Sequence, residues 1–125
     1  MFKTLILVGS GGFIGSVARY YISKIVQESS YTSFPIGTLS INIIGSLLIG
    51  FLLGLALKYP SFSVEWRMVL MVGFCGGFTT FSTFTSENFK LMQDGQFFYV
   101  LMYTGLSILL GFSAVYLGYI VSKII

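Results

Sequence analysis

The sequence contains no histidine, one cysteine and two prolines. Without histidine there is no imidazole base and no imidazole metal ligand, and the lone Cys75 cannot form an intramolecular disulfide. Charge is equally scarce, because charged residues make up only 9% of the 125 residues. Soluble domains carry about 25% charged residues, and a small chain has a large surface to cover with polar groups. These absences exclude a soluble globular domain, a disordered chain and a disulfide-rich scaffold.

Apolar residues dominate instead, at 55% of the chain, and the mean hydropathy is +0.90. A helix needs about 20 predominantly apolar residues to cross a bilayer, and four stretches have that length. We therefore predict an all-α integral membrane protein with a single transmembrane domain over residues 1–125. The expected spans are residues 4–26, 36–57, 68–89 and 97–121. The segments between them are short, with residues 61–67 interpreted as a loop, so we expect any function to lie within the membrane.

The basic residues divide almost evenly between the two ends of these spans. With four spans, one side holds Lys3, Lys58, Arg67 and Lys123, and the other holds Arg19, Lys24 and Lys90. Orientation in a membrane follows an excess of basic residues on one side. The near balance is either a weak signal in a small protein or a sign that the chain inserts both ways and pairs as an antiparallel dimer. The basic residues form no cluster that would indicate nucleic-acid binding.

Small residues recur at helical spacing and predict close helix packing. The stripes are Ser46, Gly50 and Gly54 in the second span, Gly73 and Gly77 in the third, and Ala114 and Gly118 in the fourth. The glycine-rich residues 9–15 fail the dinucleotide-binding pattern because the third glycine is one place late. We interpret them as a further packing surface.

The densest polar cluster is the string GGFTTFSTFT at residues 76–85, in the middle of the third span. Paired glycines and β-branched hydroxyl residues are poor helix formers, so we predict a break there. A break frees backbone carbonyls at mid-membrane depth, which is tolerated only where something satisfies them. Interrupted helices are a recurrent way to build ion sites, and freed carbonyl oxygens suit a hard cation such as Na⁺.

Phe81 and Phe84 lie three residues apart and share one helix face. An aromatic ring has a positive edge, so the two edges could contact a small anion, with the hydroxyls of Ser82 and Thr83 completing its shell. Spacing alone favours the simpler interpretation, that both rings face lipid or a neighbouring helix.

Four further polar residues lie in or near the spans. Asn42 either joins helices or donates to a passing anion, and Arg19 either extends to the interface or draws anions into a vestibule. Glu87 is interpreted as an interface marker rather than a proton relay. The Tyr103 hydroxyl points inward or anchors the helix at the boundary.

The string from Gly76 to Phe84 resembles the signature of the CrcB/Fluc family of fluoride channels. Two earlier segments resemble the family's first-helix and second-helix motifs: GGFIG at residues 11–15 followed by Arg19-Tyr20, and Gly37-Thr38-Leu39 followed by Asn42 and Gly45-Ser46. The resemblance covers the whole chain in order.

This resemblance implies a channel that exports cytoplasmic fluoride passively through a prokaryotic inner membrane. It further implies an antiparallel, dual-topology homodimer in lipid, with two pores and a central structural Na⁺. The implied pore residues are Phe81, Phe84, Asn42, Ser82, Thr83 and Tyr103, with Arg19 at the vestibule. The backbone carbonyls of Gly76 and Thr79 would hold the sodium ion between the subunits.

Two other functions compete with this one. A small four-span, dual-topology drug exporter would use an acidic residue inside the first span, and none occurs between Lys3 and Glu28. A non-transporting subunit of a larger complex would leave the polar cluster of the third span serving only as helix glue. An enzyme is not expected, because the chain has neither histidine nor paired carboxylates to exchange protons.

Overall fold

The computed structural model describes residues 1–125, and every regular element is a helix. Four helical segments are long and apolar enough to cross a membrane: Phe2–Ser29, Ile36–Lys58, Val64–Gln93 and Phe97–Ile124. The prediction of an all-helical chain with four helices able to span a membrane is confirmed. Each helix extends beyond the apolar stretch that predicted it, at one or both ends. Polar residues at the membrane surface can continue a helix past the part that lipid surrounds.

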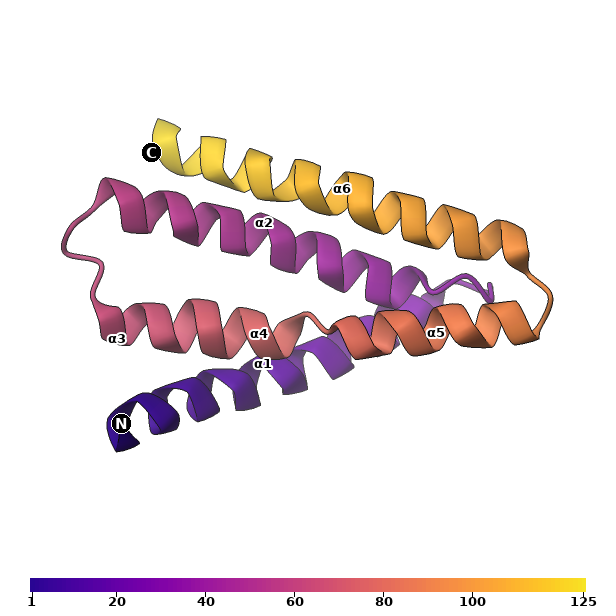
Figure 1. Ribbon diagram of the computed structural model, residues 1–125, viewed down its shortest axis with the longest axis horizontal. Coiled ribbons are helices and arrows are strands. Elements are labelled where there is room, and N and C mark those ends of the chain that lie inside the picture. The colour runs from indigo at the N-terminus through magenta and orange to yellow at the C-terminus, as the bar shows by residue number, and fades with distance from the viewer.

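The elements are α1 (Phe2–Ser29), α2 (Ile36–Lys58) and α6 (Phe97–Ile124), with the third span built from α3 (Val64–Arg67), η1 (Met68–Cys75), α4 (Gly76–Phe78) and α5 (Phe81–Gln93). α2 and α6 lie side by side, and α1 crosses the third span (Figure 1). Both termini and the α2–α3 loop lie at one end of the molecule. The α1–α2 and α5–α6 loops lie at the other (Figure 1).

Glycines allow the closest helix contacts. A Cβ at Gly50 would collide with the carbonyl oxygen of Val115, and a Cβ at Gly118 would collide with that of Leu47, so α2 and α6 meet backbone to backbone. Gly11 and Gly15 do the same for α1 against the third span. The predicted packing stripes are therefore real contacts, although Gly9 has no neighbour within 4 Å of an added Cβ.

The third span begins earlier than expected. Helix α3 occupies part of the segment interpreted as a loop, because the Ser63 side chain accepts a hydrogen bond from Trp66 N at 3.3 Å and caps the helix. The following element, η1, is a π-helix of eight residues. Its wider turn was not predicted, since the apolar run from Met68 to Cys75 has the composition of any membrane helix.

The expected break lies at Thr79 and Thr80. Both residues have extended backbones, with φ and ψ of −108° and 136° at Thr79 and −136° and 134° at Thr80. The helix stops at Phe78 and starts again at Phe81. This interruption lies about midway along the span (Figure 1).

Little of a single chain is buried. Only 18 of 125 residues are enclosed, and many large apolar side chains lie on the outside. The one compact cluster joins Leu39, Leu91 and Tyr103, and Phe34 and Phe84 pack against it. Lipid or another protein surface must cover the remaining apolar faces.

Candidate functional site

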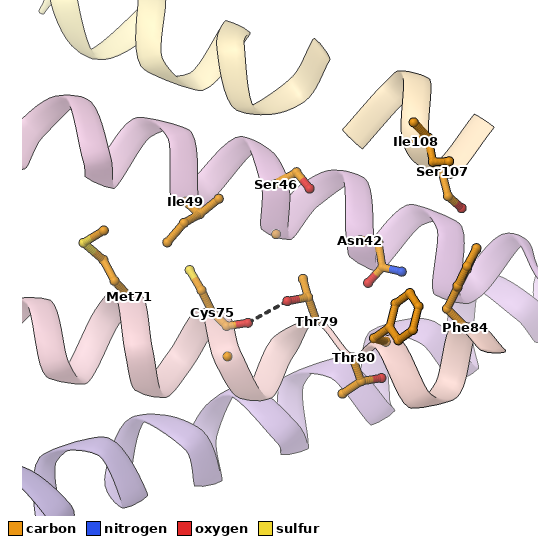
Figure 2. Close-up of a pocket in the computed structure, with 13 residues that line it drawn as sticks. Asn42, Ser46, Ile49, Met71, Cys75, Thr79, Thr80, Phe84, Ser107 and Ile108 are labelled. Carbon is orange, nitrogen blue, oxygen red and sulfur yellow. Dashed lines mark hydrogen bonds between the residues drawn. The ribbon is translucent and has the colours of Figure 1, made fainter. Parts of the chain in front are cut away.

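A cavity of about 600 Å³ lies between α2, the broken third span and α6 (Figure 2). Its lining residues are Asn42, Gly45, Ser46, Ile49, Met71, Cys75, Gly76, Thr79, Thr80, Phe81, Phe84, Ser107 and Ile108. The structure thus brings together five of the residues singled out from the sequence, namely Asn42, Gly76, Thr79, Phe81 and Phe84. They come from two spans and meet at the interruption of the third.

The break leaves an uneven set of backbone partners. The N–H and the hydroxyl of Thr79 both donate to the carbonyl oxygen of Cys75, at 3.0 and 2.9 Å (Figure 2 shows the hydroxyl bond). The carbonyl oxygens of the following residues, beginning with Gly76, would accept from N–H groups four positions further on if the helix continued. Because the backbone is extended from Thr79, these carbonyls have no helical donor. The Thr80 hydroxyl is buried without a partner. Both donors and acceptors are therefore free at mid-span.

Arg19 contacts this break directly. Its Nε donates to the carbonyl oxygen of Gly77 at 3.1 Å, which satisfies one acceptor at the end of α4. Arg19 also lines a small cavity of about 30 Å³ with Asn42, Thr80 and Thr83 among its neighbours. The side chain therefore lies against the broken helix, and the alternative in which it only extends to the interface does not describe it.

The two phenylalanines have different surroundings. Their ring centroids are 5.8 Å apart with planes at 36°, so they are tilted rather than stacked. Phe81 is 76% exposed, whereas Phe84 is partly buried and lies 4.9 Å from the ring of Tyr103. Both line the large cavity. Phe81 thus has most of its ring available to a ligand or to another protein surface.

The expected hydroxyl residues do not all lie at the cavity. Ser82 is exposed and lines none of the cavities described, and Thr83 reaches only the small one beside Arg19. Ser107, from α6, lines the large cavity instead, and its hydroxyl is buried without a partner. Ser107 was not predicted, because a lone serine in an apolar helix carries no signal of which neighbour it faces.

Glu87 and Tyr103 form a second polar group. The Tyr103 hydroxyl donates to Glu87 Oε1 at 2.8 Å, and the Thr38 hydroxyl donates to Oε2 at 2.9 Å. Tyr103 is completely buried, so its hydroxyl points inward and does not anchor the helix at the boundary. Thr38 was part of a motif but had no predicted role, since its partner lies on another span.

Neighbouring cavities that share lining residues lie between the two groups. The large and small cavities share Asn42 and Thr80. The small cavity shares Ser23 and Thr38 with a third cavity of about 270 Å³ that Glu87 also lines. The polar residues therefore follow a path from the mid-span break to the α1–α2 end of the molecule.

The donor set near the break suits a hard cation better than a transition metal. The chain has no group of three histidine, cysteine or acidic residues that could hold a metal ion. Backbone carbonyl oxygens at a broken helix are instead ligands for ions such as Na⁺. Gly76 is exposed and Thr79 is half-buried on the cavity wall, so their carbonyls fit this requirement chemically.

Comparison with known proteins gives one consistent result. A family model described as "CrcB-like protein, Camphor Resistance (CrcB)" matches residues 6–119. A "Fluoride-specific ion channel FluC" from Chlorobium luteolum is 48% identical over 96% of this chain and 92% of its own. Proteins of the same name from Pyrococcus abyssi and Azobacteroides pseudotrichonymphae are 42% and 41% identical, each over at least 97% of both chains.

The relatives are named as ion channels, which are not enzymes, and this confirms the expectation that the chain is not an enzyme. The family model spans nearly the whole chain and includes the broken third helix with its polar string. The similarity therefore covers both the fold and the cavity described above, and the chain belongs to the CrcB family.

Proposed function

We propose that this chain is a fluoride-selective ion channel that exports cytoplasmic fluoride passively down its electrochemical gradient. The observation that carries the proposal is the similarity to a relative named as a fluoride-specific ion channel, which is 48% identical over 96% of this chain. The chemistry of the large cavity is compatible with it, since an amide, hydroxyls and aromatic edges line its wall. We place the protein in a prokaryotic inner membrane.

The physical problem in passing fluoride is its tight hydration shell. A pore must replace that water with several donors at close range, yet hold the ion weakly enough for it to leave. The edges of Phe81 and Phe84, the amide of Asn42 and the hydroxyls near them offer partial positive charge only. Neither lysine nor arginine lines the large cavity. In this proposal Thr83 lines the path and the buried Tyr103 borders it through its hydrogen bond to Glu87. Ser82, which is exposed on a single chain, faces a path that a second copy completes, and Arg19 lies at the vestibule.

The assembly that we propose is an antiparallel homodimer with two pores. The largely exposed Phe81 ring and the small buried core are compatible with a second copy that covers part of each chain. The carbonyls of Gly76 and Thr79 would hold a structural Na⁺ between the copies. The ion would supply a fixed charge that ties together two broken helices, and no transport step depends on it here.

Fluoride efflux from liposomes tests the function directly. The purified chain is reconstituted in vesicles loaded with potassium fluoride, and efflux is recorded after valinomycin is added, with potassium chloride vesicles in parallel. Rapid fluoride loss with little chloride loss is the expected result. Silence for both ions from a folded, reconstituted protein would overturn the proposal.

The sodium ligands are tested by Thr79→Ser, which keeps the backbone carbonyl and also the hydroxyl that bonds to Cys75. Fluoride efflux is expected to remain close to that of the unchanged chain, because the proposed ligand is a main-chain atom. A folded Thr79→Ser protein without flux would contradict a carbonyl site at this residue.

A further inference from the structure

Gln27 makes more hydrogen bonds to main-chain atoms than any other side chain in the protein. It lies near the end of α1, and its Nε2 donates to the carbonyl oxygens of Thr32 and Phe34, both at 3.1 Å. Its Oε1 accepts from the N–H of Gly37 at 3.0 Å. A side-chain amide has two donor hydrogens and one acceptor oxygen, so all three functions are engaged. The partners also fix the orientation of the amide, since a flipped group would face an N–H with its own N–H₂.

These bonds replace a missing helix cap. The first N–H groups of a helix have no partner within it, and a side chain at the residue before the helix usually supplies one. That residue is Pro35 in α2, and it provides no side-chain cap. Gly37, the second residue of α2, instead donates to Gln27 on a different helix. Gln27 therefore caps α2 from α1.

The capped residue adjoins the polar group around Glu87. Thr38 directly follows Gly37, and its hydroxyl donates to Glu87 Oε2 at 2.9 Å. A Cβ at Gly37 would collide with the carbonyl oxygen of Ser23, so α1 and α2 touch at this residue. A small displacement at the start of α2 would consequently move the Thr38 hydroxyl away from Glu87.

The amide of Gln27 also holds Phe34, which packs against Tyr103 in the polar group around Glu87. Phe34, whose carbonyl accepts from Gln27, packs its ring edge-on against Tyr103 with centroids 5.8 Å apart. Tyr103 is the second donor to Glu87. Gln27 thus holds the residues on both sides of Pro35: Thr38, which donates to Glu87, lies after it, and Phe34, which packs against the other donor Tyr103, lies before it.

Two cavities flank Gln27 and Glu87, and both residues line each of them. One has a volume of about 270 Å³ and includes Lys24 and Thr38, and the other is about 350 Å³ and includes Lys90. The pair therefore lies between two hollows at the α1–α2 end of the polar path, where changes in the position of Glu87 would alter the passage.

We propose that Gln27 is a positioning residue for the channel: it caps α2 and holds residues 32–37, and so it keeps Thr38 and Tyr103 on Glu87 at one end of the ion path. This inference rests on the proposed fluoride channel function. It assigns Gln27 no contact with the ion.

The first test compares Gln27→Met, which keeps the length of the side chain but removes its hydrogen bonds, with Gln27→Glu, which keeps only the acceptor for Gly37. In the liposome assay, fluoride efflux is expected to fall about tenfold in Gln27→Met, which loses all three hydrogen bonds, and by less in Gln27→Glu, which keeps the bond from Gly37. Gln93→Met is the matched control, since Gln93 is exposed at the end of α5. Normal efflux from Gln27→Met overturns the inference, whereas no efflux from the unchanged chain overturns the proposed function itself.

A double variant separates positioning from general loss of structure. Thr38→Val already removes one of the two hydroxyls that Gln27 positions on Glu87, so adding Gln27→Met should lower efflux less than it does in the unchanged chain. Equal factors in the two backgrounds would overturn the inference. If Gln27→Met does not fold, Gln27→Glu replaces it in the same cycle.

Amide hydrogen exchange supplies a readout that does not depend on fluoride. The N–H of Gly37 should exchange faster in Gln27→Met and remain protected in Gln27→Glu, because only the latter keeps an acceptor for it. Unchanged protection in Gln27→Met would show that the cap is not needed.

Discussion

Phe81 and Phe84 have the same predicted role from the sequence, but the structure gives them different exposure and packing. Phe81 is 76% exposed, whereas Phe84 packs against Tyr103 with centroids 4.9 Å apart. We expect Phe81→Ile and Phe84→Ile each to lower fluoride efflux by more than about tenfold, equivalent to about 1.4 kcal/mol, because isoleucine keeps most of the bulk but has no polar ring edge. Only Phe84→Ile should also lower the thermal stability of the protein, since it removes a packed ring. Liposome efflux and thermal unfolding in detergent measure the two effects.

The control for these variants is Phe98→Ile. Phe98 is 69% exposed near the start of α6 and lines none of the described cavities. Its substitution should leave efflux unchanged. Normal efflux from both Phe81→Ile and Phe84→Ile would exclude a contact between ring edges and the ion.

Glu87 distinguishes a passive channel from a proton-coupled exporter. A channel needs no group that binds and releases protons, and Glu87 serves here as an acceptor for Thr38 and Tyr103. We expect Glu87→Gln to keep fluoride efflux within about fivefold of the unchanged chain, because glutamine retains one oxygen acceptor and forfeits about one hydrogen bond. Efflux is measured with and without an imposed pH gradient. Complete loss of transport, together with pH-driven uptake of a cationic drug by the unchanged chain, would favour the exporter.

At the scale of single residues, the sequence predicted part of the cavity lining and little of where the other polar side chains lie. Asn42, Phe81 and Phe84 do line one cavity. The spacing of the two phenylalanines predicted that they share a helix face, whereas their meeting with Asn42 depends on the packing of two spans. Ser82 does not line it, since neighbouring hydroxyls on a helix face different directions. The bonds of Glu87 join residues 16 and 49 positions apart. Such contacts depend on how helices pack, which no local pattern specifies.

The positions of the four long helices follow from composition, but only one of the two irregularities in the third span does. The break at Thr79 and Thr80 was predictable because glycine, β-branched and hydroxyl residues coincide there. The preceding π-helix was not, since its residues are ordinary apolar ones. It lies where α1 packs through Gly11 and Gly15 onto the backbone of Val69 and Phe74. The wider turn and the close approach of a second helix occur together, which makes the irregularity a property of packing.

The contact between α2 and α6 is the most extensive between any two elements and can be tested with one methyl group. A Cβ at Gly118 would collide with the carbonyl oxygen of Leu47. Gly118→Ala should lower the free energy of unfolding by about 1–3 kcal/mol, the usual cost of overpacking. Gly9→Ala is the matched control, because nothing lies within 4 Å of a Cβ there and alanine favours a helix over glycine by up to about 1 kcal/mol. Equal stabilities of the two variants in detergent would contradict a backbone contact at Gly118.

For the molecule as a whole, the distribution of basic residues hardly determines the orientation in the membrane. Both termini and the α2–α3 loop lie at one end (Figure 1). That end carries four basic residues, and the other half of the molecule carries three of the total of seven, of which Arg19 lies against the mid-span break. A difference of one is a weak determinant under the positive-inside rule. A tag on the C-terminus should therefore be found on both sides of the membrane in comparable amounts.

Shifting this balance gives a sharper test of antiparallel pairing. Ser61→Lys changes the ratio to five against three, and the triple variant Tyr31→Lys, Gln93→Lys, Asp94→Lys changes it to four against six; all four residues are exposed in or beside the loops. Each variant should adopt mainly one orientation and lose fluoride efflux when expressed alone, because an antiparallel dimer needs both. Expressing the two together should restore efflux, since each then supplies the orientation that the other lacks. Full efflux from either variant alone, with its C-terminal tag confined to one side, would show that the functional unit contains chains of a single orientation.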